Sequence, residues 1–310
     1  MRAPLTRRAM LAGTLAAMVP RRRAAADTAG MPLTLGPGAQ YGWAALDLAT
    51  GRQSAGNPEL RLPMCSSFKW LLAACVLAGA DAGRLRLDRR LPFRPGDLPP
   101  HSPVTAGALS AAGGTRAELP IEALCAATVT VSDNAAAHLL LGESGGPPAL
   151  TAWLRATGDG VTRLDRTETE LNRVPRGDPR DTTTAAAMLG NLQRLLFGTV
   201  LRAASRDRLY AWMLACETGA SRLPAGLPPG WRIAHKTGTW TVEPGHDPDD
   251  RAAAGDVGAL IPPFGPPILI AAYTAGSERP QEDIEAWFAG VARVITGNSL
   301  RERRAAAAPS

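Results

Sequence analysis

The sequence contains little cysteine and histidine and only two lysines, and after its first 26 residues it has no long uninterrupted apolar run. The four cysteines form no C-x-x-C pair and the four histidines lack metal-ligand spacing, which argues against a zinc or thioredoxin-like site. We therefore expect no metal and no other cofactor. Without a run of about 20 apolar residues, we also expect no stable membrane insertion.

Acidic residues are absent from one end of the chain. The formal charge is +6, but the first 26 residues hold six arginines and neither Asp nor Glu. Removing these six from the 34 basic residues leaves 28, which equals the 28 acidic residues of the chain. The remainder is formally neutral, so nucleic acid is not the implied partner.

Residues 1–26 have the pattern of an export signal. Residues 6–11 resemble a twin-arginine motif, a short apolar stretch follows to Val19, and residues 24–26 supply small side chains for cleavage. Three arginines between that stretch and the cleavage site favour the twin-arginine route over the general secretory route. We expect an exported protein, periplasmic or secreted.

Lysine is so rare that its positions are informative. Of the 34 basic residues, 32 are arginine, and the two lysines are Lys69 and Lys236. Arginine serves as well as lysine for solvated charge, but only lysine loses its proton when it is buried. Lys69 stands in an apolar stretch, which suggests that its amine must titrate.

Ser66 lies three residues before Lys69, at the expected start of a buried helix. Pro63 interrupts the preceding chain, and residues 70–77 contain neither glycine nor proline. Residues three apart share a helix face, so the amine can reach the hydroxyl. Unpaired N–H groups in the first turn favour developing negative charge. These are the parts of an activated serine nucleophile, although a capped helix with a solvated lysine is the alternative.

Three other segments carry polar groups with two interpretations each. Residues 132–134 (Ser-Asp-Asn) are either helix N-cap residues or a loop that presents a second hydroxyl and an amide. Residues 236–239 (Lys-Thr-Gly-Thr) lie on an expected strand, where the glycine indicates close approach of a ligand and the other groups suit a carboxylate. Residues 166–184 form either a solvated loop or one closed by an ion pair between Arg166 and Asp181.

The order of the expected elements indicates an α/β (α+β) protein of two domains that are discontinuous in sequence. We expect a mostly helical middle at residues 66–197 and a closing helix at residues 281–295. We expect strands at residues 41–48, 231–240, 257–261 and 268–274. The expected sheet domain consists of residues 31–60 and 205–297. The inserted helical domain is residues 61–204 and includes the 166–181 loop. We expect residues 298–310 to be a disordered tail. We expect a monomer.

Taken together, the motifs resemble those of the class A serine β-lactamases. They are Ser-x-x-Lys at 66–69, Ser-Asp-Asn at 132–134, Glu-x-Glu-Leu-Asn at 168–172 and Lys-Thr-Gly-Thr at 236–239. The resemblance extends from about residue 41 to residue 295. It implies an antiparallel sheet flanked by helices, an inserted all-helical domain with the active site between the two, and small-molecule β-lactams as substrates.

The resemblance also implies roles for the matching residues. Ser66 would attack the lactam carbonyl, and Ser132 would relay a proton to the lactam nitrogen. Glu168 and Asn172 would activate the water that releases the product, while either Lys69 or Glu168 would take the Ser66 proton. The backbone N–H groups of Ser66 and Thr239 would form the oxyanion hole. The implied substrate-binding residues are His101, Asn134, Arg222, Lys236, Thr237, Gly238 and Thr239.

The chain departs from the family pattern at its cysteines and in one loop. Cys125 matches half of a disulfide known in part of the family, but Ala73 stands at the partner position. Cys65 matches half of a bridge typical of carbapenemases, and Trp240 stands where its partner would be. The connection 240–255 is longer than usual, and we expect it to shape the access of bulky substrates.

Two other functions use related chemistry. A penicillin-binding DD-peptidase would use the same serine and lysines, and a β-lactam-sensing domain would be acylated once and then remain silent. Both would lack a deacylating carboxylate, so Glu168 favours the hydrolase.

Overall fold

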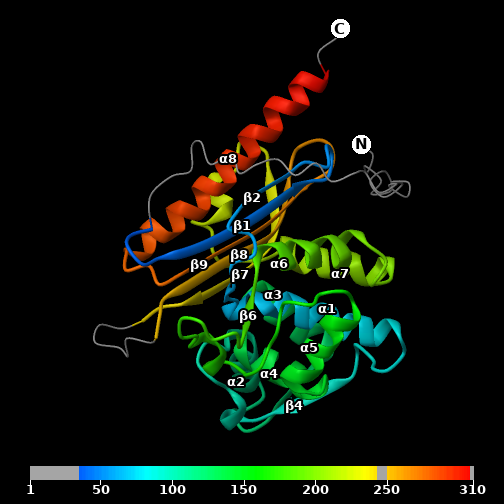
Figure 1. Cartoon of the computed structure of the whole chain (residues 1–310). Helices are drawn as coiled ribbons and strands as arrows, with labels where there is room; N and C mark the ends of the chain where they lie inside the picture. Colours follow the sequence, from blue (N-terminus) through cyan, green and yellow to red (C-terminus); the bar gives the residue numbers. More distant parts are fainter. Residues whose placement is uncertain (1–34, 243–249, 308–310) are drawn as a thin grey trace, which may run out of the picture.

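The computed structural model describes residues 35–242 and 250–307, with a five-stranded antiparallel sheet as its largest element (Figure 1). The strand order is β2-β1-β9-β8-β7, and the register pairs Trp43 with Ala272 and Lys236 with Val257. The strands are β1 (Gln40–Asp47), β2 (Gln53–Gly56), β7 (Arg232–Trp240), β8 (Ala253–Ile261) and β9 (Ile268–Ala275). The expected export signal and residues 243–249 of the long 240–255 connection lie outside the described residues.

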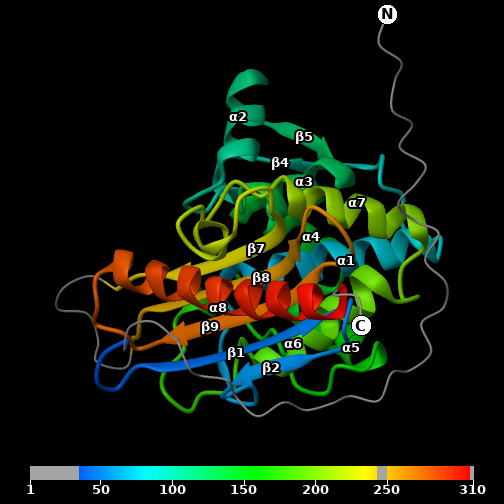
Figure 2. The same cartoon turned by 90° about the horizontal axis from the view of Figure 1, so that it is seen from above.

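Both faces of the sheet are covered, which explains why every residue of β9 is buried. Helix α8 (Gln281–Ala307) lies along one face, where Trp287 and Phe288 pack with Trp43 of β1 (Figure 2). Helix α6 (Ala185–Leu192) and the helical part of the chain cover the other face. Figures 1 and 2 agree on this layering of helix, sheet and helices.

The helical part is built around α1 (Lys69–Asp81), which is buried over most of its length because its sequence carries almost no polar side chain. The surrounding helices are α2 (Pro103–Ala111), α3 (Ile121–Thr130), α4 (Asn134–Glu143), α5 (Gly146–Ala156) and α7 (Ala203–Leu214). Two short strand pairs complete it, β3 (Leu62–Pro63) with β6 (Thr182–Thr183) and β4 (Arg90–Phe93) with β5 (Ala117–Pro120). None of the described helices is long and apolar enough to cross a membrane.

The predicted fold class is confirmed, whereas the predicted disordered tail is wrong for residues 298–307; residues 308–310 lie outside the described residues. Helix α8 continues to Ala307. Asp47, at the end of β1, accepts hydrogen bonds from Ser299 Oγ at 2.6 Å and from Arg303 Nη2 at 2.9 Å. The Arg, Glu and Ala residues of this segment also have high helix propensity. The contacts of Asp47 with Ser299 and Arg303 therefore order a segment whose composition alone predicts a disordered tail.

Candidate active site

Ser66 lies in a short 3-10 turn, η1 (Cys65–Phe68), that leads into α1. Its Oγ donates a 2.7 Å hydrogen bond to Glu168 Oε1 and accepts a 3.0 Å bond from Lys69 Nζ. The second distance is the one expected for side chains on the same helix face. Ser66 itself is only half-buried, so its hydroxyl is accessible between two buried charged groups.

Lys69 is fully buried and joins the first three motifs. Its Nζ donates to the backbone oxygen and Oγ of Ser132 at 2.9 and 3.2 Å and to Asn134 Oδ1 at 2.5 Å. It also lies 3.1 Å from Glu168 Oε1. Burial lowers the pKa of Lys69, and the Glu168 carboxylate opposes that shift. Such an amine is able to exchange protons with its neighbours.

Glu168 is buried and held on both sides. Burial opposes its ionisation, but the charge of Lys69 and hydrogen bonds from Ser66 and Asn172 lower its pKa. Asn172 Nδ2 donates to Glu168 Oε2 at 2.8 Å, while its Oδ1 is buried without a partner among the described residues. The backbone oxygen of Glu168 accepts a 2.7 Å bond from His138 Nε2. The sequence reasoning missed His138, although it lies one helical turn after Asn134.

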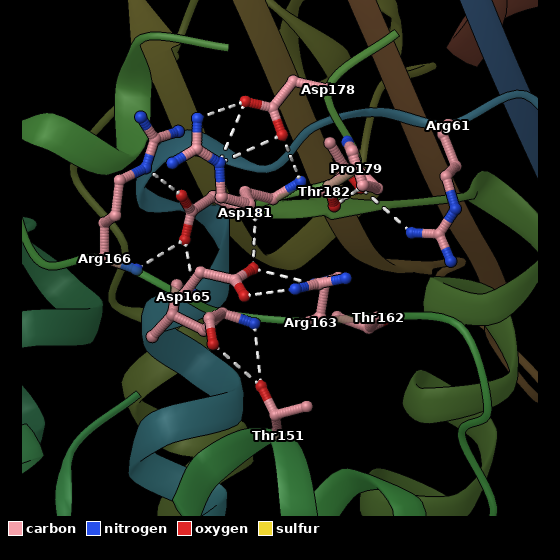
Figure 3. A network of polar contacts seen from close by, with 12 residues as sticks. Arg61, Thr151, Thr162, Arg163, Asp165, Arg166, Asp178, Pro179, Asp181 and Thr182 are labelled. Atoms are coloured by element: carbon pink, nitrogen blue, oxygen red, sulfur yellow. Dashed lines mark hydrogen bonds and ion pairs between the residues drawn. The ribbon is translucent and has the colours of Figure 1, made fainter. Parts of the chain in front are cut away.

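The loop that carries Glu168 is closed at its base by the expected ion pair. Arg166 Nε lies 2.6 Å from Asp181 Oδ2, and the Asp181 side chain is fully buried. Asp181 Oδ1 also accepts from the backbone N–H groups of Asp165 and Arg166, at 2.7 and 3.0 Å. Figure 3 shows this network, in which the first and last residues of the loop are joined through Asp181. The solvated-loop interpretation is therefore wrong at the base of the loop.

Both interpretations of residues 132–134 hold, each for different side chains. Asp133 is the N-cap of α4, where it accepts from the backbone N–H of Ala136 at 2.8 Å. Ser132 has a φ of 62°, a left-handed conformation, and its side chain and that of Asn134 reach Lys69. The cap fixes the turn, and the turn directs the two flanking side chains into the site.

His101 lies at the edge of this cluster. Its backbone oxygen accepts from the Asn134 N–H at 3.0 Å, but its exposed ring donates to the Val131 carbonyl at 2.9 Å. The ring therefore contacts Val131 rather than another residue of the predicted set. Asn134 Nδ2 donates to the Pro100 carbonyl at 2.7 Å, which fixes this segment beside the site.

Strand β7 forms the opposite wall. Lys236 is fully buried with its Nζ 2.8 Å from the Thr237 carbonyl, and burial together with the charge of Lys69 lowers the pKa of Lys236 to about 7. The Thr237 hydroxyl shares a 2.6 Å hydrogen bond with Thr218, a residue that sequence reasoning did not identify. Buried Arg222 donates to the carbonyls of Gly238 and Gly255 at 2.9 and 3.1 Å and to Thr239 Oγ1 at 2.7 Å.

The structure corrects the reason for the glycine in β7. A Cβ at Gly238 would lie 2.4 Å from the Met64 carbonyl and 2.8 Å from the Ser67 nitrogen. The close neighbour is therefore the η1 turn itself rather than a ligand. The missing side chain lets β7 pack directly against the turn that carries Ser66.

Within residues 35–242 and 250–307, no three His, Cys, Asp or Glu residues are arranged to hold a metal ion. All four cysteines, including Cys65 and Cys125, are free thiols in the structure.

Known proteins are similar to this chain over most of its length. The model of the beta-lactamase enzyme family matches residues 32–298. Beta-lactamase L2 of Stenotrophomonas maltophilia is 45% identical over 240 residues, which are 77% of this chain and 74% of that protein. Beta-lactamase AST-1 of Nocardia asteroides is 39% identical over 88% of this chain and 83% of that protein.

Solved structures give the same result. A reconstructed ancestral class A beta-lactamase superposes with a TM-score of 0.77 at 46% identity, covering 84% of this chain and 95% of that chain. A beta-lactamase from Xanthomonas campestris pv. campestris superposes with a TM-score of 0.75 at 39% identity, covering 83% of this chain and 91% of that chain.

Proposed function

This chain belongs to the class A β-lactamases, and we propose that it opens β-lactam rings through an acyl-enzyme on Ser66 that Glu168 helps water to hydrolyse. One observation carries the proposal: the Ser66 hydroxyl donates to Glu168 and accepts from Lys69. A hydroxyl placed between a carboxylate and an ammonium has both a proton acceptor and a group that stabilises the resulting alkoxide.

In the acylation step, Ser66 Oγ bonds to the lactam carbonyl carbon while its proton passes to Glu168 Oε1, 2.7 Å away. The C–N bond of the ring then breaks, and the nitrogen needs a proton. Lys69 Nζ lies 3.2 Å from Ser132 Oγ, so this hydroxyl can pass a proton from the amine to the leaving nitrogen. Glu168 then gives the Ser66 proton to the neutral Lys69 amine, 3.1 Å away, which restores the Glu168 carboxylate before deacylation. The geometry favours Glu168 over Lys69 as the acylation base.

The substrate would be held between β7 and the 132–134 turn. Lys236, Thr237 and Thr239 offer an ammonium and two hydroxyls to a carboxylate, and Arg222 fixes Thr239 from behind. Asn134 offers an amide to the substrate side chain. The backbone N–H groups of Ser66 and Thr239 would bind the developing oxyanion, where losing one donor costs roughly 100- to 1,000-fold in rate.

Deacylation distinguishes this enzyme from a DD-peptidase or a sensing domain. Glu168 Oε2 is fixed by Asn172, whose unpartnered Oδ1 offers an acceptor for a water molecule. That water would lose its proton to Glu168 as its oxygen attacks the ester carbonyl carbon. The bond from that carbon to Ser66 Oγ then breaks, and Ser66 takes the proton back from Glu168 Oε1, 2.7 Å away. A protein that is acylated and then silent has no use for this carboxylate.

Mass spectrometry of the protein mixed with a penicillin tests the mechanism. We expect a transient acyl adduct in the unaltered protein and a long-lived adduct in the Glu168→Gln variant. Glu170→Gln is the matched control, because Glu170 is an exposed carboxylate on the same loop. An adduct that persists equally in the unaltered protein would refute the hydrolase, and rapid turnover by Glu168→Gln would refute the role of Glu168.

We further propose that the enzyme is exported by the twin-arginine route to the periplasm or the medium and acts as a monomer of two domains. The support is the sequence pattern of residues 1–26 and the position of the site between sheet and helices. Cell fractionation tests the route: replacing both Arg7 and Arg8 by lysine should retain the enzyme in the cytoplasm. Unchanged export would refute that route.

A further inference from the structure

Cys216, His235 and Asp256 form a second polar cluster outside the Ser66 network. His235 Nδ1 donates a 2.8 Å hydrogen bond to Asp256 Oδ1, and both side chains are buried. Asp256 is held in turn by the Leu223 N–H at 3.3 Å. The half-buried Cys216 thiol, which follows the end of α7, lines the same cavity as the imidazole and hydrogen-bonds Thr218 Oγ1 at 3.3 Å. A thiol, an imidazole and an orienting carboxylate are the parts of an activated cysteine nucleophile.

This cluster opens on a cavity of about 410 Å³ between α7 and β7. Cys216 and His235 both line it, together with the apolar side chains of Leu214 and Ile233. The charged residues Glu217 and Arg232 also line it, and both are exposed to solvent. A small molecule in this cavity can therefore reach the thiol, and it lies near one carboxylate, Glu217, and one guanidinium, Arg232.

The charges around the thiol favour its ionisation. Burial opposes ionisation, but the His235 imidazolium, the Lys236 amine and a hydrogen bond from Thr218 together lower the pKa of Cys216 to about 7. Burial also disfavours the imidazolium, yet Asp256 and the Cys216 thiolate raise the pKa of His235 to about 10. The cluster is therefore poised as a thiolate–imidazolium pair near neutral pH.

The other three cysteines lack such partners. Burial raises the pKa of Cys75 to about 11, although Cys75 is half-buried like Cys216. Cys65 and Cys125 are fully buried, and burial raises the pKa of each thiol as well. Cys75 is thus an internal control for a thiol of similar exposure without an activating base.

We propose that Cys216, His235 and Asp256 form a second nucleophilic site that undergoes exchange with small zwitterionic disulfides such as cystine. The Cys216 thiolate attacks one sulfur, a new S–S bond forms, and the original S–S bond breaks. The departing thiolate takes the proton held on His235, so one small thiol is released and Cys216 is left in a mixed disulfide. Arg232 and Glu217 would pair with the carboxylate and ammonium groups of the disulfide.

The mixed disulfide would affect substrate binding, a consequence that rests on the proposed function. Cys216 Sγ lies 3.3 Å from Thr218 Oγ1, and that hydroxyl bonds the Thr237 hydroxyl at 2.6 Å. A substituent on the sulfur displaces Thr218 and so removes the partner that orients Thr237. We expect KM for a penicillin to rise several-fold in the modified protein, with kcat changed less.

The test exposes the unaltered protein to cystine between pH 6 and 10 and maps the modified cysteines by mass spectrometry. At pH 7 we expect Cys216 to react about 100-fold faster than Cys75, because a larger thiolate fraction outweighs lower intrinsic nucleophilicity. The Cys216 rate should level off above about pH 8, whereas the Cys75 rate should keep rising. Equal rates for the two cysteines, or no plateau, would overturn the proposal without bearing on lactam hydrolysis.

Two further experiments test the role of His235 and the preference of Cys216 for charged disulfides. His235→Asn should slow exchange at Cys216 at least tenfold at pH 7 with an unchanged circular dichroism spectrum. If that variant does not fold, the plateau in the pH profile of the unaltered protein decides whether the Cys216 thiol is activated. Cystine should react faster than uncharged 2-hydroxyethyl disulfide at Cys216 but not at Cys75, and equal preference at both cysteines would overturn the assigned charge recognition.

Discussion

Replacing Gly238 by alanine separates the two walls of the active site without removing any functional group. The new Cβ would lie 2.4 Å from the Met64 carbonyl oxygen, whereas carbon–oxygen contacts of this kind are found at about 3.3 Å or more. Strand β7 or the η1 turn must therefore move by roughly 1 Å. The Ser67 nitrogen at 2.8 Å and the Cys65 Cβ at 3.0 Å block smaller adjustments.

Two effects follow from this displacement. Overpacking of this kind costs about 1–3 kcal/mol of unfolding free energy, which lowers Tm by roughly 2–10 °C in a chain of this size. A misplacement of about 1 Å between reacting groups can reduce the rate by about 100-fold. Because the displacement shifts β7 relative to the turn that carries Ser66, we expect the loss in kcat/KM to exceed the loss expected from stability alone.

The assay combines thermal unfolding with steady-state hydrolysis of a chromogenic cephalosporin at a temperature where the variant is folded. Gly107→Ala is the control, since Gly107 is exposed in α2 and nothing lies within 4 Å of its new Cβ. That change should stabilise the protein by about 0.5–1 kcal/mol and leave activity unaltered. A Gly238→Ala protein with unchanged Tm and kcat/KM would refute the packing argument.

Three further changes test other contacts of the site. Arg222→Ala leaves the Gly238 and Gly255 carbonyls without their donor, so kcat/KM should fall about 10- to 100-fold, and an unchanged value would contradict this support role. Asp181→Asn should cost about 1–3 kcal/mol in chemical denaturation and prolong the acyl-enzyme, and equal stability would argue against the closed loop base. Because the Lys236 pKa is about 7, its amine is cationic below that pH and neutral above it. KM for an anionic penicillin should therefore rise between pH 6 and 9, and a constant KM would exclude Lys236 as the carboxylate partner.

Local rules predicted the parts of the site that depend on short spacing. Ser66 and Lys69 meet because residues three apart share a helix face, and the motif pattern located Glu168 on a loop. Strands β1, β7, β8 and β9 were predictable for a related reason, since short apolar runs bounded by turns are typical of buried strands. Strand β2 was not predicted, because its residues Gln53–Gly56 form no apolar run. The antiparallel order came from the family resemblance rather than from the residues themselves.

Contacts between distant segments could not be predicted in this way. Thr218 reaches Thr237 only because the chain after α7 passes beside β7, and no local pattern indicates that proximity. His138 was detectable in principle from its helical spacing to Asn134, but its partner is a backbone carbonyl, which carries no sequence signature. The tail was wrongly predicted because Asp47, which holds it, lies at the opposite end of the chain.

The central position of β9 has a consequence for biosynthesis. Strand β1 pairs on one side with β2, but its other neighbour is β9, which the ribosome produces more than 200 residues later. Until then the β1–β2 hairpin has an open hydrogen-bonding edge that other chains can join. Pairing across such a separation is also slow to form. Nascent or C-terminally truncated chains should therefore depend on chaperones, and the site around Ser66 should not be complete until β7 has been made.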